Sequence, residues 1–310
     1  MTFGMLASAQ GVGLALKRAG IWLVLISLSF GAAATEARQL TDELGRAVEL
    51  PDEPKRIVSL APSITETLFA LGLEARIVGV TDYCQYPEAA KQKAKVGGII
   101  NPNLERIVSL KPDLLVVTTE ANNSEILAPM NRFGIPVFAI SPRSLDGVLA
   151  SIALLGEATG SQAQAKALVE ELTRRRLAIA HKVKNRARPR VLILYDLHPI
   201  VAGGKNAFPT ALIREAGGVS VTGELEQDWP RLNIEYIVKE DPEVIFVSQM
   251  PSIRRQVEAL KSLSGWKMTS AVKNNRIYVV DDRINQPGPR LVEALEVLAE
   301  QIHPDAFDAP

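Results

Sequence analysis

A strand-free helical stretch in the middle of the chain constrains its fold more than any other feature. In residues 144–184, "SLDGVLASIALLGEATG" predicts one helix and "SQAQAKALVEELTRRRLAIAHKVK" predicts a second, which Ser161 would cap. The second helix has about 24 residues and would span about 36 Å. Because the stretch is not rich in Gly, Ser or Pro, it does not have the composition of a flexible linker. We therefore expect a stiff helix that joins two separate parts of the protein.

Apolar strand-like runs alternate with helical segments on both sides of this stretch. Strands are predicted before it in "RIVSLAP", "RIVGVT", "LLVVTT" and "PVFAIS", and after it in "VLILYD", "VIFVSQ" and "RIYVVDD". Such alternation is typical of crossover units that build a mostly parallel sheet. At 310 residues, the chain also exceeds the usual size of a single core. The predicted fold class is therefore α/β: two Rossmann-like lobes with mostly parallel sheets, and a ligand cleft between them.

These patterns divide the chain into four segments. We assign residues 1–37 to a signal peptide, 38–160 to an N-terminal lobe, 161–186 to an interlobe helix and 187–310 to a C-terminal lobe. In the N-terminal lobe, "QLTDELGRAVELP" predicts a hairpin. "SITETLFALG" predicts a short helix capped by Ser63, and "PEAAKQK" predicts a helix whose first turn holds Pro87.

One pattern occurs twice, once in each lobe. "NLERIVSLKPDLLVV" (103–117) aligns without a gap with "NIEYIVKEDPEVIFV" (233–247). In both, Asn can cap a helix, Glu stands in its first turn, and Pro with an acidic residue ends it before an apolar strand. Such punctuation can recur by chance, and "RIVSL" also begins at Arg56, where we predict a strand. The unbroken spacing nevertheless favours an internal duplication.

The first 37 residues have the composition of an export signal. Lys17 and Arg18 precede the apolar run "AGIWLVLISLSFGAAA", and small residues offer cleavage after Ala34 or Ala37. We expect cleavage and a periplasmic location, although an uncleaved membrane anchor is the alternative because the run nearly reaches spanning length. The only cysteine is Cys84, so we expect neither a lipid attached after this run nor an internal disulfide.

Composition and motifs argue against several other functions. Lys plus Arg and Asp plus Glu are balanced at 35 each without a polybasic run, which argues against a nucleic-acid partner. No strand leads into a glycine-rich dinucleotide or phosphate motif, so an enzyme on a Rossmann-like fold is only a remote alternative. His181, His198 and His303 are scattered, and their spacing predicts no resident metal site or cofactor. An adhesion or signalling module would need a retained anchor or a further domain.

Five stretches carry a family resemblance from about Lys55 onward. They are "RIVSLAPSITETLFALG", "VGVTDYCQYPEAA", "NPNLERIVSLKPDLLVV", "QDWPRLNIEYIV" and "GPRLVEAL". With them, the chain resembles the periplasmic solute-binding proteins of ABC importers whose lobes are joined by one long helix, and the cobalamin-binding members most of all. The resemblance implies a monomer that captures a corrinoid and delivers it to an ABC permease with its ATPase. Haem or a ferric siderophore is the alternative cargo.

The resemblance and the strand ends indicate which residues would contact the cargo. Tyr83 and Trp229 match aromatic contact positions of the cobalamin-binding members, and Asp282 matches a polar one. Ile99 and Val201 stand where those members carry Trp and Phe. The remaining candidates share a place on the loops that follow predicted strands, where an open parallel sheet binds ligands: Cys84, Arg283 and Asn285.

Three of these assignments leave alternatives open. Cys84 could be a small buried residue or a soft ligand of the metal in the cargo. Tyr86, next to Pro87, is interpreted as a packing residue. The cobalamin-binding members carry an Arg near Gln286 that this chain lacks, so a corrinoid other than cobalamin remains an alternative.

The two repeats also contain the predicted contacts with the permease. In the family that the chain resembles, one glutamate on each lobe docks onto arginines of the permease, and here these would be Glu105 and Glu235. A carboxylate in the first turn of a helix is favoured by the helix dipole, so the placement is physically reasonable. The alternative is that each glutamate only completes a capping box in its own helix.

Overall fold

The computed structural model describes residues 37–119, 127–249 and 257–307, and the predicted signal peptide lies outside them apart from its last residue. The N-terminal half contains a five-stranded sheet in the order β5–β4–β3–β6–β7, in which all neighbours are parallel. Its strands are β3 (Ile57–Ser59), β4 (Ile77–Val80), β5 (Ala94–Lys95), β6 (Leu114–Thr118) and β7 (Val137–Ile140). The predicted hairpin is formed by β1 (Ala37–Thr41) and β2 (Ala47–Pro51). The predicted parallel sheet is therefore confirmed.

The C-terminal half contains a second sheet, in the order β11–β9–β8–β12–β13, with β10 beside β8. Its strands are β8 (Arg190–Leu197), β9 (Ile200–Ala202), β10 (Val219–Ser220), β11 (Arg231–Leu232), β12 (Val244–Ser248) and β13 (Ile277–Val280). The pairs of β8 with β10 and β12, and of β12 with β13, are parallel. The short strands β9 and β11 add antiparallel pairs, which the sequence patterns did not predict. The sheet is mostly parallel, as expected.

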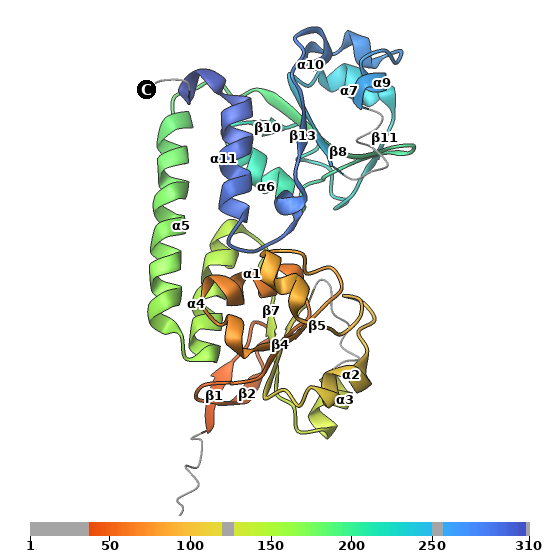
Figure 1. The fold of residues 1–310 in the computed structure, drawn as a ribbon. Coiled ribbons are helices and arrows are strands. Elements are labelled where there is room, and N and C mark those ends of the chain that lie inside the picture. The colour runs from red at the N-terminus through yellow and green to blue at the C-terminus, as the bar shows by residue number, and fades with distance from the viewer. Residues whose placement is uncertain (1–36, 120–126, 250–256, 308–310) are drawn as a thin grey trace, which may run out of the picture. The chain divides into compact units, whose positions relative to one another are not determined.

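Helices connect the strands in both halves (Figure 1). The N-terminal half has α1 (Pro62–Ala70), α2 (Leu104–Ser109), α3 (Leu127–Arg132) and α4 (Leu145–Thr159). The C-terminal half has α6 (Phe208–Glu215), α7 (Ile234–Glu240), α9 (Val257–Leu260), α10 (Ser270–Lys273) and α11 (Leu291–Ile302). Among the described residues, no helix is both long and apolar enough to cross a membrane.

Two of the predicted helix starts differ from the structure. The cap predicted at Ser63 is wrong: α1 begins at Pro62, its N-cap position is Ala61, and Ser63 lies inside the first turn. Proline favours the first position of a helix, and it moves the start one residue ahead of the serine. The segment after Pro87 forms a 3₁₀ helix, Glu88–Gln92, rather than an α-helix.

The long predicted helix is present as α5 (Gln162–Val183). Its buried side chains Ala165, Leu172 and Ile179 recur every seven residues and form one apolar stripe. This helix packs against α4 and against α11. Ser161 does occupy the N-cap position, but its hydroxyl bonds Thr159 Oγ1 at 2.7 Å and makes no capping bond, so the predicted cap is wrong in this respect.

Arginines of α5 tie it to elements of both halves. The Arg176 guanidinium donates two hydrogen bonds to Glu215 of α6, at 2.7 and 2.9 Å, and also bonds Asp146 of α4. Charge-assisted bidentate pairs of this kind hold a defined geometry. The contact with α4 is equally close, because a Cβ added at Gly156 would collide with the Cβ of Ala165.

A single cluster of buried apolar side chains runs through both halves. It includes Leu114 of β6, Leu155 of α4, Leu172 of α5, Phe246 of β12 and Leu298 of α11. A smaller apolar cluster lies on the opposite face of each sheet. One contains Val58 and Leu115 of the N-terminal sheet, and the other contains Leu192 and Ile245 of the C-terminal sheet. The buried stripe of the long helix is therefore part of the core of the molecule.

The two sequence repeats have the same local structure at the start of their helices. Asn103 Oδ1 accepts a hydrogen bond from the Arg106 amide at 2.9 Å, and Asn233 Oδ1 accepts one from the Tyr236 amide at 2.8 Å. Both asparagines are therefore the N-caps that the sequence predicts.

The repeats also end alike. Lys111 and Asp241 both have left-handed backbones, with φ of 47° and 42°. Arg56 Nε donates to the carbonyl oxygens of residues 110 and 111, and Arg190 Nε donates to those of residues 240 and 241. Asp113 accepts from the Arg56 amide just as Glu243 accepts from the Arg190 amide. Chance recurrence of helix punctuation does not explain these matched contacts, which favour duplication.

Candidate ligand-binding site

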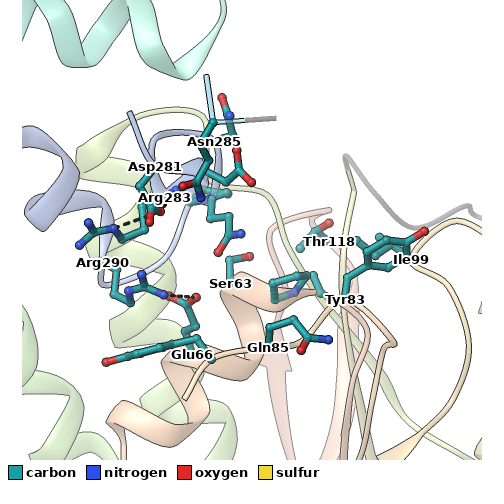
Figure 2. A pocket seen from close by; sticks show the side chains of 17 residues that line it. Ser63, Glu66, Tyr83, Gln85, Ile99, Thr118, Asp281, Arg283, Asn285 and Arg290 are labelled. Carbon is teal, nitrogen blue, oxygen red and sulfur yellow. Dashed lines mark hydrogen bonds and ion pairs between the residues drawn. The ribbon is translucent and has the colours of Figure 1, made fainter. Parts of the chain in front are cut away.

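A pocket of about 530 Å³ is lined by side chains from both halves. Figure 2 shows side chains that converge on it from several elements. The N-terminal half contributes the start of α1, the loop after β4 and the end of β6; the C-terminal half contributes the end of β12 and residues 281–290 after β13. These are the carboxyl ends of parallel strands, where open α/β sheets bind ligands. The predicted ligand cleft is therefore present.

A partly buried ion pair joins the two halves at this pocket. Arg290, which precedes α11, donates from Nη1 to Glu66 Oε1 of α1 at 3.2 Å (Figure 2). Glu66 is only 5% exposed, and this burial raises the pKa of its carboxyl to about 7 although Arg290 acts in the opposite direction. The guanidinium of Arg290 also lies over the ring of Tyr86, 3.9 Å from its centroid.

The second arginine of the pocket is also paired with carboxylates. Arg283 Nη1 donates to Glu293 Oε2 at 2.9 Å, and its Nε lies 3.2 Å from Asp281 Oδ1. Glu293 is in turn 3.7 Å from Arg290. The pocket also contains Asp282, so its carboxylates outnumber its two arginines.

Most of the other polar side chains around the pocket are uncharged. They are amides and hydroxyls that can both donate and accept hydrogen bonds: Ser63, Gln85, Thr118, Gln249, Asn285 and Gln286. Tyr83, which is 63% exposed, adds aromatic surface to the pocket, and Ile99 adds apolar surface. The pocket can therefore hold a flat, largely apolar body and bind neutral polar groups on its edge.

Five of the residues that the sequence nominated line this pocket. They are Tyr83, Ile99, Asp282, Arg283 and Asn285. Tyr86, interpreted from sequence as a packing residue, lines the pocket as well as packing against Arg290.

Cys84 does not line the pocket, so its nomination as a ligand contact needs correction. Its side chain is fully buried, and its Sγ lies 3.1 Å from the hydroxyls of both Thr65 and Thr81. The structure thus agrees with the alternative of a small buried residue. Among the described residues, no group of three His, Cys, Asp or Glu side chains could hold a metal ion.

Val201 and Trp229 also lie outside the pocket lining. Val201 is in β9, where it pairs with Arg231 of β11. Trp229 is half exposed, and its ring meets that of Tyr195 edge-on, with centroids 4.8 Å apart. The Tyr195 hydroxyl donates to Asn285 Oδ1 at 2.7 Å, so Tyr195 links Trp229 to a residue of the pocket lining.

Sequence reasoning missed the ion pair of Glu66 and Arg290, and it also missed the polar lining residues Asp281, Ser63, Gln85, Thr118, Gln249 and Gln286. One signal for the first pair was available. Glu66 is the only charged residue in "SITETLFALG", and a charge within an otherwise apolar short helix needs a buried partner. Nothing local indicated that the partner would be Arg290, because the two residues are 224 positions apart.

Glu105 and Glu235 are both exposed in the first turns of α2 and α7. Within the described ranges, neither carboxylate makes a hydrogen bond or an ion pair that would complete a capping box. The asparagine side chains cap these helices without them. The two carboxylates are therefore available to a partner.

Known proteins with the same organisation identify the family. The family model for "Periplasmic binding protein" matches residues 57–284. A Bacillus subtilis protein described as an uncharacterized ABC transporter substrate-binding lipoprotein is 32% identical, with 94% of this chain and 99% of the relative covered. A cobalamin-binding protein of Halobacterium salinarum is 32% identical, with 84% and 73% covered. The apo structure of a periplasmic heme-binding protein from Roseiflexus superposes with a TM-score of 0.74 at 28% identity, with 81% and 99% covered. The chain therefore belongs to the periplasmic binding protein family.

Proposed function

We propose that this protein is the substrate-binding component of an ABC importer, and that it captures a corrinoid in the pocket between its halves. The loaded protein would deliver this cargo to a membrane permease driven by an ATPase. The relatives named as an ABC transporter substrate-binding lipoprotein and as a cobalamin-binding protein support the class of protein and the class of cargo.

The lining of the pocket is the observation that carries the choice of cargo. Corrinoids such as cobalamin carry neutral carboxamides around the ring, whereas haem carries two carboxylates. Both arginines of the pocket are already paired with Glu66, Asp281 or Glu293, so a cargo carboxylate would have to compete for them. Buried charges need such partners, whereas a carboxamide can bond the uncharged amides and hydroxyls directly. A corrinoid is larger than the pocket, so part of it would extend over the exposed ring of Tyr83.

Haem is the second candidate, for one reason in the site itself. The phenol of Tyr83 is exposed at the pocket, and tyrosine can serve as an axial ligand of haem iron. The heme-binding protein of Roseiflexus has the same fold, which is compatible with this alternative.

The two candidates can be separated by measuring binding to the purified protein. Quenching of tryptophan fluorescence would be titrated with cyanocobalamin, cobinamide, haemin and a ferric siderophore. We expect a corrinoid to bind at least tenfold more tightly than haemin. Tighter binding of haemin, together with loss of that binding in Tyr83→Phe, would favour haem instead.

Delivery would use the matching glutamates of the two repeats. Glu105 and Glu235 are exposed at equivalent positions of α2 and α7, so they offer two separate points of negative charge. Two such points could fix the orientation of the protein on a pair of basic sites of the permease.

The remaining features of the proposal concern organisation and location. Residues 38–160 and 187–310 would act as two lobes, and residues 161–186 would hold them so that they close only slightly around the cargo. Its ties to both halves, through Arg176 above all, support this stiffness. We further propose a monomer in the periplasm, exported by a signal peptide that is cleaved near residue 37.

A further inference from the structure

The carboxyl group of Glu66 has one oxygen that is hydrogen-bonded and one that has no partner among the described residues. Oε1 accepts the hydrogen bond from Arg290, whereas Oε2 is buried and has no partner among the residues that the structure describes. A buried acceptor without a partner is costly, and native proteins rarely keep one without a reason. Glu66 lines the pocket, so a rotation of its carboxyl group would turn this oxygen toward a group on the cargo.

Glu66 stands at a boundary between two cavities. Behind the ligand pocket lies a second cavity of about 350 Å³, with Phe69, Leu168 and Leu172 among its walls. Glu66, Tyr86 and Arg290 line both spaces, so these three side chains form a partition. The stacking of Arg290 on Tyr86 and its ion pair with Glu66 hold the partition in place before cargo arrives.

The side chains around Glu66 suit a donor group on the cargo better than an acid. Ser63 lies one turn before Glu66 in α1 and lines the same wall (Figure 2). Together, the hydroxyl of Ser63 and the unpartnered Oε2 of Glu66 offer one hydrogen-bond donor and one acceptor to a carboxamide. A carboxylate in the same place would meet Glu66 and would find Arg290 already engaged.

We propose that Glu66 is a specificity-determining residue of the pocket: its Oε2 accepts an N–H of a neutral carboxamide on the cargo and rejects a carboxylate at that place. The Ser63 hydroxyl donates to the carbonyl oxygen of the same carboxamide. The inference rests on the proposed function, because it assigns the part of the cargo that this wall recognises. Discrimination arises from an attractive bond to the right group and from repulsion of the wrong one.

The test compares cyanocobalamin with the derivatives in which one peripheral carboxamide has been hydrolysed to a carboxylate. Calorimetry at pH 8.5 measures both affinities for the wild type and for Glu66→Gln, which keeps the size of the side chain. We expect the wild type to bind cyanocobalamin at least tenfold more tightly than one of these monocarboxylates, and we expect Glu66→Gln to reduce that ratio to less than threefold. Should Glu66→Gln fail to fold, Glu66→Leu supplies the same comparison.

Glu300→Gln is the control. Glu300 is exposed on α11 and is not among the residues that line either cavity, so this variant removes one negative charge without altering the pocket wall or the pairing of its arginines. We expect its affinity ratio to equal that of the wild type. An equal loss of the ratio in both variants would overturn the inference, because it would reflect the net charge and not the position of Glu66.

The outcomes also separate this inference from the proposed function. If the wild type binds cyanocobalamin and its monocarboxylates equally tightly, the proposed role of Glu66 is wrong and the corrinoid assignment stands. The same holds if Glu66→Gln leaves the ratio of these two affinities unchanged. If the wild type binds only haemin, the corrinoid assignment is wrong. The role of Glu66 is then decided by the ratio of the affinities for haem diamide and for haemin, measured in the wild type and in Glu66→Gln.

Discussion

The buried carboxyl of Glu66 makes the stability of the protein depend on pH in a way that one substitution can isolate. Its pKa is raised from the ordinary value of 4.5 to about 7 in the folded protein, chiefly by burial. The folded state therefore keeps a proton between these two values that the unfolded state releases. Stability from this group is fully present below pH 4.5, is lost as the pH rises, and stays lost above about pH 7.

The size of the effect follows from the difference between the two pKa values. A rise from 4.5 to about 7 corresponds to about 3 kcal/mol of unfolding free energy. Glu66→Gln resembles the protonated side chain and cannot ionise. We therefore expect the variant to gain about 3 kcal/mol relative to the wild type between pH 4 and pH 8.5, most of it between pH 5 and pH 7.

The assay is urea unfolding of both proteins at four pH values, followed by circular dichroism. Taking the difference between wild type and variant at each pH cancels the titration of the groups that do not interact with Glu66. Glu300→Gln, which removes an exposed acid on α11 and leaves the contacts of Glu66 intact, serves as the control for the loss of one negative charge. A difference that stays constant with pH, or one that favours the wild type as the pH rises, would refute the reasoning.

Three other variants, one of them double, test separate parts of the structure and the proposal. Glu105→Lys combined with Glu235→Lys should abolish stimulation of the transporter ATPase in proteoliposomes while cargo affinity is unchanged; lower affinity would place these residues in the pocket. Gly156→Val should destabilise the fold by about 1–3 kcal/mol in urea unfolding, because its side chain enters the tight contact between α4 and α5, and unchanged stability would contradict that contact. Tyr83→Ala should weaken cargo binding about tenfold, worth about 1.4 kcal/mol, because its exposed ring lines the pocket; an unchanged affinity in the titrations would contradict this geometry.

The elements that the sequence predicts well are those that depend on local pattern. The strands of both sheets are short apolar runs, and the seven-residue spacing of Ala165, Leu172 and Ile179 marks the buried stripe of α5. The repeated asparagine caps are equally local, because Asn103 and Asn233 bond amides three residues further along the chain.

The features that the sequence does not predict depend on distant partners or on competition between neighbours. Ser161 prefers the hydroxyl of Thr159 to the free amides of its helix, and no local pattern distinguishes these two bonds. Glu66 and Arg290 meet because the two halves bring their strand ends together. The sequence around one of these residues therefore does not indicate that the other is its partner. Cys84 follows a strand in the expected place, but its side chain turns inward to two threonine hydroxyls.

The apolar cluster shared by both halves has a consequence for how the chain folds. Leu155, Leu172 and Leu298 come from α4, α5 and α11, and each covers surface that the others would otherwise expose to water. A cut within α5 would leave both fragments with uncovered apolar faces, so we expect neither to fold alone. Although the repeats point to two copies of one ancestral unit, melting should therefore occur in a single cooperative transition.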